Sequence, residues 1–545
     1  MRNYIKILLP AGIICILCAV LIPPFHRWAR EHVNLITATG DHPLNCASCH
    51  LYIQKSGIIS KLVNSNYYSP LNLAVSNDGK NLYVVAEEGN ALLVVETYKQ
   101  KVTHKVEVGN HPHSVILSKD GKTAYISNQW SDNVSVVDLT NFTVTNTLKT
   151  GGGPAGLALS AEERYLYVAN SFSSDLSVID LSSGAERKRL TAGNNPTGMQ
   201  INTDGRLYVT SRRTLSAPFG DTLRCELTVV NDNIQRVVER RDIKSAYMME
   251  NIAFNPKGDL AIMPLIRPKN NVPAIQIERG WMMTNGIGII ELKPAGRTVQ
   301  LLFDEPNAYY SDPFDIAITP DGKRAFISNA GADCITVIDI DSIRTLLAGS
   351  TDKMLDIYSN HLGIGSRFVI KRILTGANPK GLGLSPDGKI LYVAEHLQDR
   401  IAVISTGSLE TIGTIDLGGP GRITVARRGR QLFNNAGHTF QTQYSCYTCH
   451  PDAHEDGLVY NMASKDMGRN ITNTQSLRNI GKTPPYKWNG KNLTVYKQDG
   501  MRFSTVLTRT EAFNYKDLDA LTAYIMTGIP NPPNLQYNPD GDLTE

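Results

Sequence analysis

The segments YLYVAN at Tyr165–Asn170 and LSVID at Leu176–Asp180 decide the fold, because they belong to a unit that the chain repeats. Each copy contains short runs rich in β-branched and aromatic residues, bounded by turn signals, as expected for strands. The first four copies start 42 residues apart. The copies begin at or near Pro70, Pro112, Pro154, Pro196, Glu250, Pro313 and Pro379, the last three in degenerate form.

Each copy has one turn between its first two strands, typically of the Asp-Gly kind seen at Asn77-Asp78-Gly79. Seven copies of a four-stranded unit predict a seven-bladed β-propeller over residues 67–420, because radial repetition leaves only short sheet edges. An open solenoid is the alternative, and the seven regular turns favour the ring. We expect residues 57–64 to close it as an outer strand beside the last blade.

The segments YLYVAN and LSVID also resemble the YVTN repeat family, and the resemblance covers about residues 60–420. Insertions at about 211–224 and 264–286 fall between the second and third strands of copies four and five, and one at 341–366 between the third and fourth strands of copy six. The first two share a face with the loops that join successive copies. That face should carry functional loops, with these side chains: Arg212, Arg213, Arg224, Arg267, Lys269, Arg279, Trp281, His111, His113 and His396.

Two pentapeptides of the form C-x-x-C-H flank the repeats, and this pattern is the attachment signature of a c-type haem. In each, two cysteines would form thioethers and the following histidine would be the proximal iron ligand. The residues are Cys46, Cys49 and His50 in the first motif, and Cys446, Cys449 and His450 in the second. The sequence therefore predicts two covalently bound haem c groups. Cys225 and Cys334 should be unpaired, since the repeat places them two blades apart.

Residues 421–545 form a further predicted domain, with helices over 427–436 and 515–526. Its segments Ser476–Asn479 and Thr483–Gly490 resemble the haem domain of the di-haem cytochrome c peroxidase and MauG superfamily, over about 120 residues. The resemblance implies a distal methionine at Met501. Other sulfur and imidazole groups compete with it: Met462, Met467, Met526, His438 and His454. The superfamily has two adjacent haem domains, whereas a whole propeller separates the motifs here.

The N-terminal sequence predicts a targeting segment, because Arg2 and Lys6 precede an apolar run from Ile7 to Ile22. No small-residue cleavage site follows, so we expect residues 1–24 to be an uncleaved membrane anchor rather than a removed signal peptide. Residues 25–66 then form a tether that carries the first motif. Since c-type haem is attached outside the cytoplasm in bacteria, the protein should lie on the periplasmic side of the inner membrane.

The expected class is thus mainly β: an anchored seven-bladed propeller with an α-helical cytochrome c domain. A formal charge of +4 over 545 residues, without a basic run, gives nucleic-acid binding no support. Two functions remain open. One is a peroxidase- or MauG-like oxidoreductase, in which His111, His113 or His396 completes the first haem or borders a substrate pocket. The other is an electron carrier whose propeller docks a redox partner, either a small cytochrome or a quinol-linked complex.

The ends of a closed ring are neighbours, so we expect the two haems to meet over one face of the propeller. The alternative keeps the first haem on its tether near the membrane.

Overall fold

The computed structural model places the predicted propeller and the C-terminal segment in one compact unit. It describes these residues: 67–271, 277, 282–462, 471–488, 490, 492–500 and 503–533. The predicted anchor at 1–24, the tether at 25–66 and the proposed closing strand at 57–64 lie outside this range, as does the predicted pairing of the two haems. Within the described residues, no helix is both long and apolar enough to cross a membrane.

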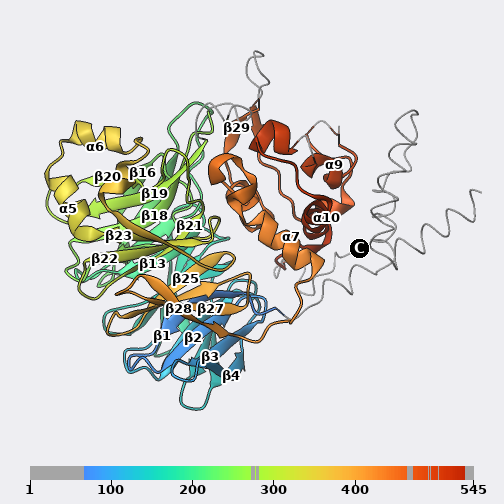
Figure 1. The fold of residues 1–545 in the computed structure, drawn as a ribbon. Coiled ribbons are helices and arrows are strands. Elements are labelled where there is room, and N and C mark those ends of the chain that lie inside the picture. Colours follow the sequence, from blue (N-terminus) through green and yellow to red (C-terminus); the bar gives the residue numbers. More distant parts are fainter. Residues whose placement is uncertain are drawn as a thin grey trace, which may run out of the picture. The chain divides into compact units, whose positions relative to one another are not determined.

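The described residues contain seven four-stranded antiparallel sheets, which confirms the seven-bladed β-propeller (Figure 1). Each sheet uses four strands that are consecutive in the chain. The first four blades are β1 (Pro70–Val75), β2 (Asn81–Ala86), β3 (Ala91–Glu96) and β4 (Lys101–Glu107); β5 (Pro112–Leu117), β6 (Thr123–Asn128), β7 (Asn133–Asp138) and β8 (Thr143–Lys149); β9 (Pro154–Leu159), β10 (Tyr165–Asn170), β11 (Asp175–Asp180) and β12 (Ala185–Thr191); and β13 (Pro196–Ile201), β14 (Arg206–Ser211), β15 (Arg224–Asn231) and β16 (Arg236–Lys244).

The last three blades depart more from the repeat. They are β17 (Ala253–Phe254), β18 (Leu260–Pro268), β19 (Met283–Glu291) and β20 (Thr298–Leu302); β21 (Pro313–Ile318), β22 (Arg324–Asn329), β23 (Cys334–Asp339) and β24 (Val369–Leu374); and β25 (Pro379–Leu384), β26 (Ile390–Glu395), β27 (Arg400–Ser405) and β28 (Glu410–Asp416). In the fifth blade β18 and β19 run further than predicted, so the insertion there begins at Lys269 rather than at residue 264. The seventh blade has four strands of its own, from β25 to β28.

The motif that revealed the repeat has a direct structural role. Asn170 ends β10 fully buried, and its amide donates to the carboxylate of Asp175 at 2.7 Å and to the hydroxyl of Ser177 at 2.9 Å. In the second blade the Asn128 amide donates at the equivalent positions, to the side-chain oxygens of Asn133 and Ser135. The asparagine thus fixes the turn between the second and third strands, which explains its recurrence in the sequence.

The turns between the first and second strands follow from local chemistry. In the first blade the hydroxyl of Ser76 and the backbone N–H of Lys80 donate to Asp78 at 2.7 and 3.1 Å. These hydrogen bonds lower the pKa of Asp78 to about 2. Gly79 follows with φ +72°, a conformation that glycine adopts without strain. The Asp-Gly signal therefore marks a stable turn.

A belt of contacts closes the ring around the central channel. In each blade the belt residue is the third residue of the innermost strand. In blade five, whose innermost strand is short, the belt residue lies in the loop before that strand. The Asn72 amide donates to Ser114 at 3.3 Å, and the Asn251 amide donates to Asp315 at 2.6 Å. At Gly156 and Gly381 the neighbouring backbone lies so close that a side chain would collide with it. Because Gly381 meets Leu71 and Asn72, the seventh blade packs directly on the first.

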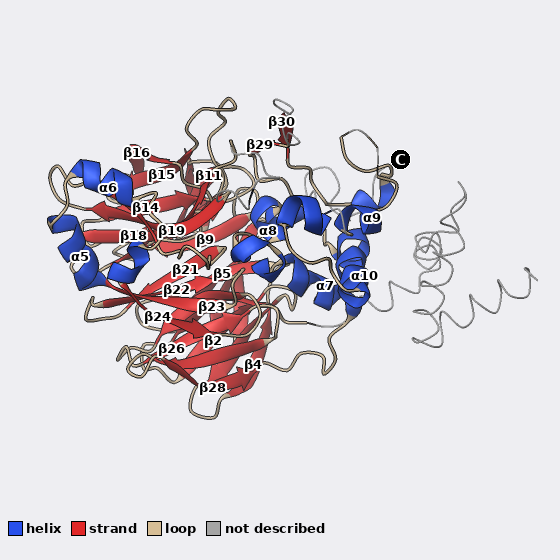
Figure 2. Cartoon of the chain, turned by 45° about the horizontal axis from the view of Figure 1, so that its top comes forward, coloured by secondary structure: helices blue, strands red, loops and turns tan. Residues whose placement is uncertain are grey.

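The helices lie on opposite sides of the sheets (Figures 1 and 2). Within blade six, α5 (Ile340–Ala348), α6 (Asp352–Tyr358) and η2 (Ile364–Arg367) fill the insertion between β23 and β24. On the other side lies the C-terminal segment. Its elements are α7 (Val425–Phe433), η3 (Ala436–His438), η4 (Phe440–Thr442), α8 (Cys446–Cys449), η5 (Pro451–Ala453), β29 (Val459–Asn461), β30 (Ile471–Asn473), η6 (Ile480–Lys482), α9 (Val495–Asp499), η7 (Phe503–Thr508), α10 (Tyr515–Ala523) and η8 (Tyr524–Gly528).

The belt generates a test of ring closure. An alanine at Gly156 would place its Cβ 2.0 Å from the Thr197 carbonyl oxygen of the next blade, so the Gly156→Ala variant should lose about 3 kcal/mol of unfolding free energy. The control is Gly421→Ala, because nothing lies within 4 Å of that position. Urea denaturation should place the Gly156→Ala midpoint well below that of Gly421→Ala. Equal midpoints would contradict the tight belt.

Candidate functional site

The second C-x-x-C-H motif begins on a single helical turn, α8, whose start is capped by its own side chains. The Ser445 hydroxyl accepts from the Thr448 N–H at 3.3 Å, and the Thr448 hydroxyl accepts from the Ser445 N–H at 2.9 Å. This reciprocal capping satisfies two of the donors that a helix start leaves free. Local sequence therefore orients Cys446 and Cys449 along one turn, with His450 directly after it.

The propeller holds this turn through a buried carboxylate. Asp312, in the loop before β21, accepts from the hydroxyls of Ser445 at 2.6 Å and Thr448 at 2.5 Å. Its side chain is buried, which raises its pKa to about 6, although both hydroxyls act against that rise. From the fourth-to-fifth blade connection, the Tyr247 hydroxyl donates to the Thr448 carbonyl at 2.9 Å. Two blades thus clamp α8 at both its side chains and its backbone.

The two thiols are half-buried and pack against an aromatic and apolar core, and His450 is also half-buried. Burial raises the pKa of Cys446 to about 12 and also that of Cys449, so both are neutral thiols, and the Cys449 sulfur lies 3.5 Å from the Tyr460 hydroxyl. Burial lowers the pKa of His450 to about 4, so its ring is neutral, as a metal ligand requires. The His450 Nδ1 atom is buried without a hydrogen-bond partner among the described residues.

The core around the motif combines residues from both parts of the chain. Its buried members include Tyr247, Met282, Leu432, Phe433, Tyr444, Tyr447, Leu458, Tyr460, Tyr486, Leu521, Tyr524 and Ile525. Two thiols one helical turn apart, a neutral imidazole and an apolar aromatic surround are the donor set and setting that a covalently attached haem needs. The residues present therefore fit that group. No cluster of three or more His, Cys, Asp or Glu side chains suited to a bare metal ion occurs in the described ranges.

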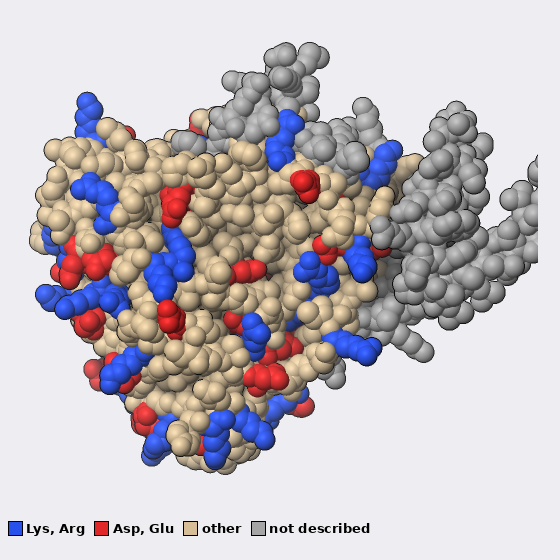
Figure 3. All heavy atoms as spheres, viewed as in Figure 1, with Lys and Arg blue, Asp and Glu red and all other residues tan. Residues whose placement is uncertain are grey.

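Charged groups gather beneath α7, whereas acidic and basic side chains are interspersed over the surface seen in Figure 3. Arg430 binds Glu87 at 3.0 Å and also Glu88. Arg427 binds Glu88 at 3.0 Å and Asp399 at 3.2 Å. Both arginines come from α7, and the three carboxylates come from loops of blades one and seven. These ion pairs fix how the C-terminal segment sits at the seam of the ring.

Two arginines of the predicted basic face bind this segment. Arg212 lies 2.7 Å from Glu250 and also contacts Asp452, just beyond the C-x-x-C-H motif. Arg213 reaches Glu455 at 3.7 Å. Elsewhere Arg224 pairs with Asp242, and Arg267 contacts Gln300. Arg279 and Trp281 lie outside the described residues.

Two of the three predicted histidines, His111 and His396, contact Glu87. His396 engages both ring nitrogens, Nε2 with Glu87 at 2.8 Å and Nδ1 with Asn378 at 3.2 Å, and its role at the first haem stays a prediction. His111 stacks on Trp130 and lies 3.7 Å from Glu87. His113 lies in β5 rather than in the preceding loop, and burial lowers its pKa to about 3.

The other predicted haem residues have different outcomes. Cys46, Cys49, His50, Met467 and Met501 lie outside the described residues, so their roles stay predictions. Met526 accepts a hydrogen bond from the Tyr486 hydroxyl at 3.7 Å, and His438 packs on Phe513. Cys225 and Cys334 are buried, unpaired thiols in blades four and six, as predicted.

Sequence reasoning missed Asp312, Tyr247 and the Arg430 ion pairs, because each acts across a long separation in the chain. One signal was available for Asp312. The residue before each innermost strand has a positive φ in six blades with a proline start, and these residues are Ser69, His111, Gly153, Asn195, Asp312 and Asn378. In the other five of these blades the position holds a neutral polar residue, histidine or glycine. The acidic side chain of Asp312 therefore indicates an additional function at this position.

The docking contacts generate a second test. Replacing Arg430 by Met leaves the buried carboxylate of Glu87 without its arginine, and removing one partner of a buried pair costs about 3–5 kcal/mol. Urea denaturation and limited proteolysis should both show a loosened C-terminal segment. The control is Arg428→Met on the same helix, whose side chain is 47% exposed and pairs with Asp517, so its loss should stay below about 1 kcal/mol. Equal effects of the two substitutions would exclude the docking role.

Comparisons with known proteins agree with the propeller. A family model described as lactonase, 7-bladed beta-propeller, matches residues 96–216. Hydrazine synthase subunit beta of Kuenenia stuttgartiensis is 33% identical over 171 residues, which are 31% of this chain and 44% of that protein. The match thus spans less than half the length of this curated relative. A solved chain of Kuenenia stuttgartiensis hydrazine synthase aligns at 29% identity with a TM-score of 0.60, covering 63% of this chain and 97% of that chain. The propeller is therefore homologous to a hydrazine synthase subunit.

Proposed function

We propose that the chain is an exported di-haem c-type cytochrome that transfers electrons as a subunit of a multi-subunit redox enzyme. The observation that carries this proposal is the C-x-x-C-H turn at Cys446–His450, which packs against an aromatic core and is clamped by the propeller. The homology of the propeller to a subunit of hydrazine synthase supports the part of the proposal that concerns assembly.

In this proposal Cys446 and Cys449 hold one haem through thioethers and His450 binds its iron, while Cys46, Cys49 and His50 hold the other. A haem supplies a one-electron couple at iron. The protein residues supply the rest: Asp312 and Tyr247 orient the attachment turn, and the aromatic core packs against the two cysteines. Because His450 is held neutral, its ring can act as a ligand without first losing a proton.

The partners follow from this role. We propose that a small cytochrome or a quinol-linked complex exchanges electrons with the protein on the periplasmic side of the inner membrane, and that residues 1–24 anchor it there. The propeller would present its remaining surface to the other subunits.

A peroxidase- or MauG-like oxidoreductase is the second candidate. It is favoured by the likeness of Ser476–Asn479 and Thr483–Gly490 to that superfamily. Electron paramagnetic resonance distinguishes the two candidates, because an open iron in an enzyme is five-coordinate and high-spin, whereas two six-coordinate low-spin haems are typical of a carrier.

Haem content tests the proposal directly. The intact mass and the pyridine haemochrome spectrum of the purified wild-type chain should give two haems, and the pair Cys446→Ala and Cys449→Ala should remove one. Cys225→Ala is the matched control, because this buried thiol lies in blade four and should leave both haems attached. A wild-type chain with no haem, or full haem content after loss of Cys446 and Cys449, would rule the proposal out.

A further inference from the structure

The C-terminal segment contains a stretch in which nearly all charged residues are basic. Between Asp466 and Glu511 the sequence has one acidic residue, Asp499, which is buried, and eight basic residues. The basic residues are spaced along the stretch: Arg469, Arg478, Lys482, Lys487, Lys491, Lys497, Arg502 and Arg509. Of these, Arg469, Lys491 and Arg502 lie outside the described residues. We call residues 482–499, in the middle of the stretch, the basic loop.

The basic loop is held together by its own hydrogen bonds. The Tyr486 N–H donates to the Asn492 carbonyl at 2.7 Å, so the chain between them forms a short turn. The Asn492 amide donates to the side chain of Gln498 in α9, which joins this turn to the helix. The Trp488 indole N–H donates to the Asn473 carbonyl at 3.1 Å. The loop therefore presents a defined surface.

That surface combines positive charge with exposed apolar groups. Lys482 and Lys497 are exposed, and neither forms an ion pair with a residue that the structure describes. Lys487 is half-buried and its charge acts on the buried carboxyl of Asp499, so the positive charge at the surface lies at the other two lysines. The side chains of Trp488 and Leu493 are 66% and 68% exposed.

Acidic side chains elsewhere in the segment are used in ion pairs with arginines. The pairs are Asp452 with Arg212, Glu455 with Arg213 and Asp517 with Arg428. These carboxylates are thus matched by cations outside the basic loop and do not neutralise its two exposed lysines.

The basic loop shares a core with the C-x-x-C-H motif. Tyr486 and Val495 are buried in the same apolar core against which Cys446 and Cys449 pack. From the propeller, Asp312 holds the attachment turn. The outer side of the basic loop is therefore solvent-exposed surface that lies close to the motif.

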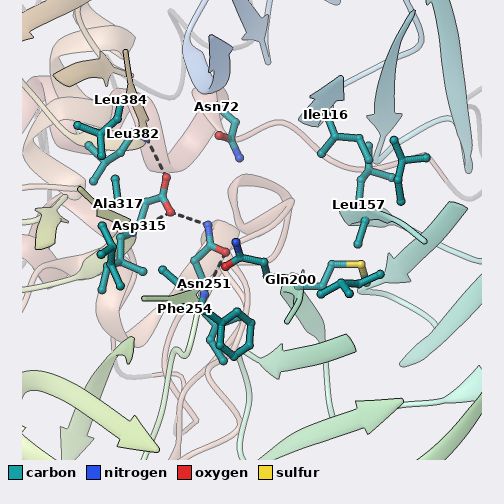
Figure 4. Close-up of a pocket in the computed structure, with 18 of the residues that line it drawn as sticks. Asn72, Ile116, Leu157, Gln200, Asn251, Phe254, Asp315, Ala317, Leu382 and Leu384 are labelled. Carbon is teal, nitrogen blue, oxygen red and sulfur yellow. Dashed lines mark hydrogen bonds between the residues drawn. The ribbon is translucent and has the colours of Figure 1, made fainter. Parts of the chain in front are cut away.

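The propeller channel does not provide this access. A cavity of about 540 Å³ lies in the channel (Figure 4). The residues that line it fall between Asn72 and Leu384, in the blades, and none belongs to the C-terminal segment. The cavity therefore does not reach the motif, so contact with a redox partner is expected at the outer surface of the C-terminal segment.

We propose that the basic loop is the docking surface for a small, acidic electron-transfer protein. Opposite charges on two partners increase their association rate and orient their encounter. An exposed tryptophan is the kind of side chain that contributes most to binding when a partner covers it. A surface confined to one loop fits the small interfaces of transient electron-transfer complexes. This proposal rests on the proposed function, because it requires a haem at Cys446–His450.

Stopped-flow reduction of the full-length holoprotein by flavodoxin hydroquinone, a small and strongly acidic one-electron donor, tests the proposal. At low ionic strength the double variant Lys482→Glu with Lys497→Glu should lower the second-order rate constant about tenfold. Added salt should slow the wild type and reduce the difference, because it screens exposed charges. The control is Lys80→Glu with Lys389→Glu, which changes the net charge equally at propeller side chains that are 76% and 81% exposed, and should react like the wild type.

The uncharged semiquinone of lumiflavin should reduce all three proteins at the same rate, which shows that the haems themselves are unchanged. A chain without haem absorbance would refute the proposed function and this proposal together. Haem-containing double variants that react equally fast with flavodoxin would overturn the docking surface alone. Loss of binding to phosphatidylglycerol vesicles by the loop variant, with an unchanged flavodoxin rate, would assign the loop to a lipid surface and also overturn the proposal.

Discussion

The hydrogen bonds from Ser445 and Thr448 to the buried carboxylate of Asp312 are the constraint on which the functional region depends. The helix that carries Cys446 and Cys449 is one turn long, and isolated helices of that length do not persist in water. Its geometry must therefore come from capping and from tertiary contacts. Asp312 and Tyr247 supply those contacts from a rigid ring, so the position of the attachment turn is set by the propeller rather than by the segment that contains it.

The ion pairs beneath α7 also fix the position of the C-terminal segment. They act through the cost of leaving buried charges unpaired. Buried pairs of opposite charge gain little net stability, because desolvation offsets most of their attraction. They do penalise any other arrangement, since a shifted α7 would leave Glu87 and Asp399 buried without partners. We infer that they specify the orientation of the C-terminal segment. The apolar core around Tyr444, Tyr460 and Tyr524 then supplies most of the favourable free energy of docking.

The sequence was sufficient to predict the repeated strands and turns, and the features that depend only on neighbouring residues. Asn170 and the Asp78-Gly79 turn recur at fixed positions because each satisfies local hydrogen-bonding groups. From this recurrence we predicted the number of blades, the order of the strands and the face on which each insertion lies. The predicted strands and helices were less accurate in the blades that depart from the repeat. The inner strand of blade five is only Ala253–Phe254, and the helices α5 and α6 in blade six were read simply as an insertion.

The candidate site was predictable only in its C-x-x-C-H motif. Cys446, Cys449 and His450 form a contiguous motif, but Asp312 lies more than 130 residues away and Glu87 more than 340 from Arg430. No spacing rule links such residues before the ring has closed. For the loop histidines the position was predicted but the partners were not. The face that they share was predicted from sequence, whereas the partners of His396 are side chains of the ring itself.

If the propeller positions an iron centre at His450, iron anomalous scattering from crystals of the holoprotein will locate it. Data collected on both sides of the iron absorption edge should place one iron at bonding distance from a His450 ring nitrogen, with Cys446 and Cys449 joined to the same macrocycle and Asp312 still bound to Ser445 and Thr448. Absence of iron at His450 in a chain that retains its haem would contradict the account.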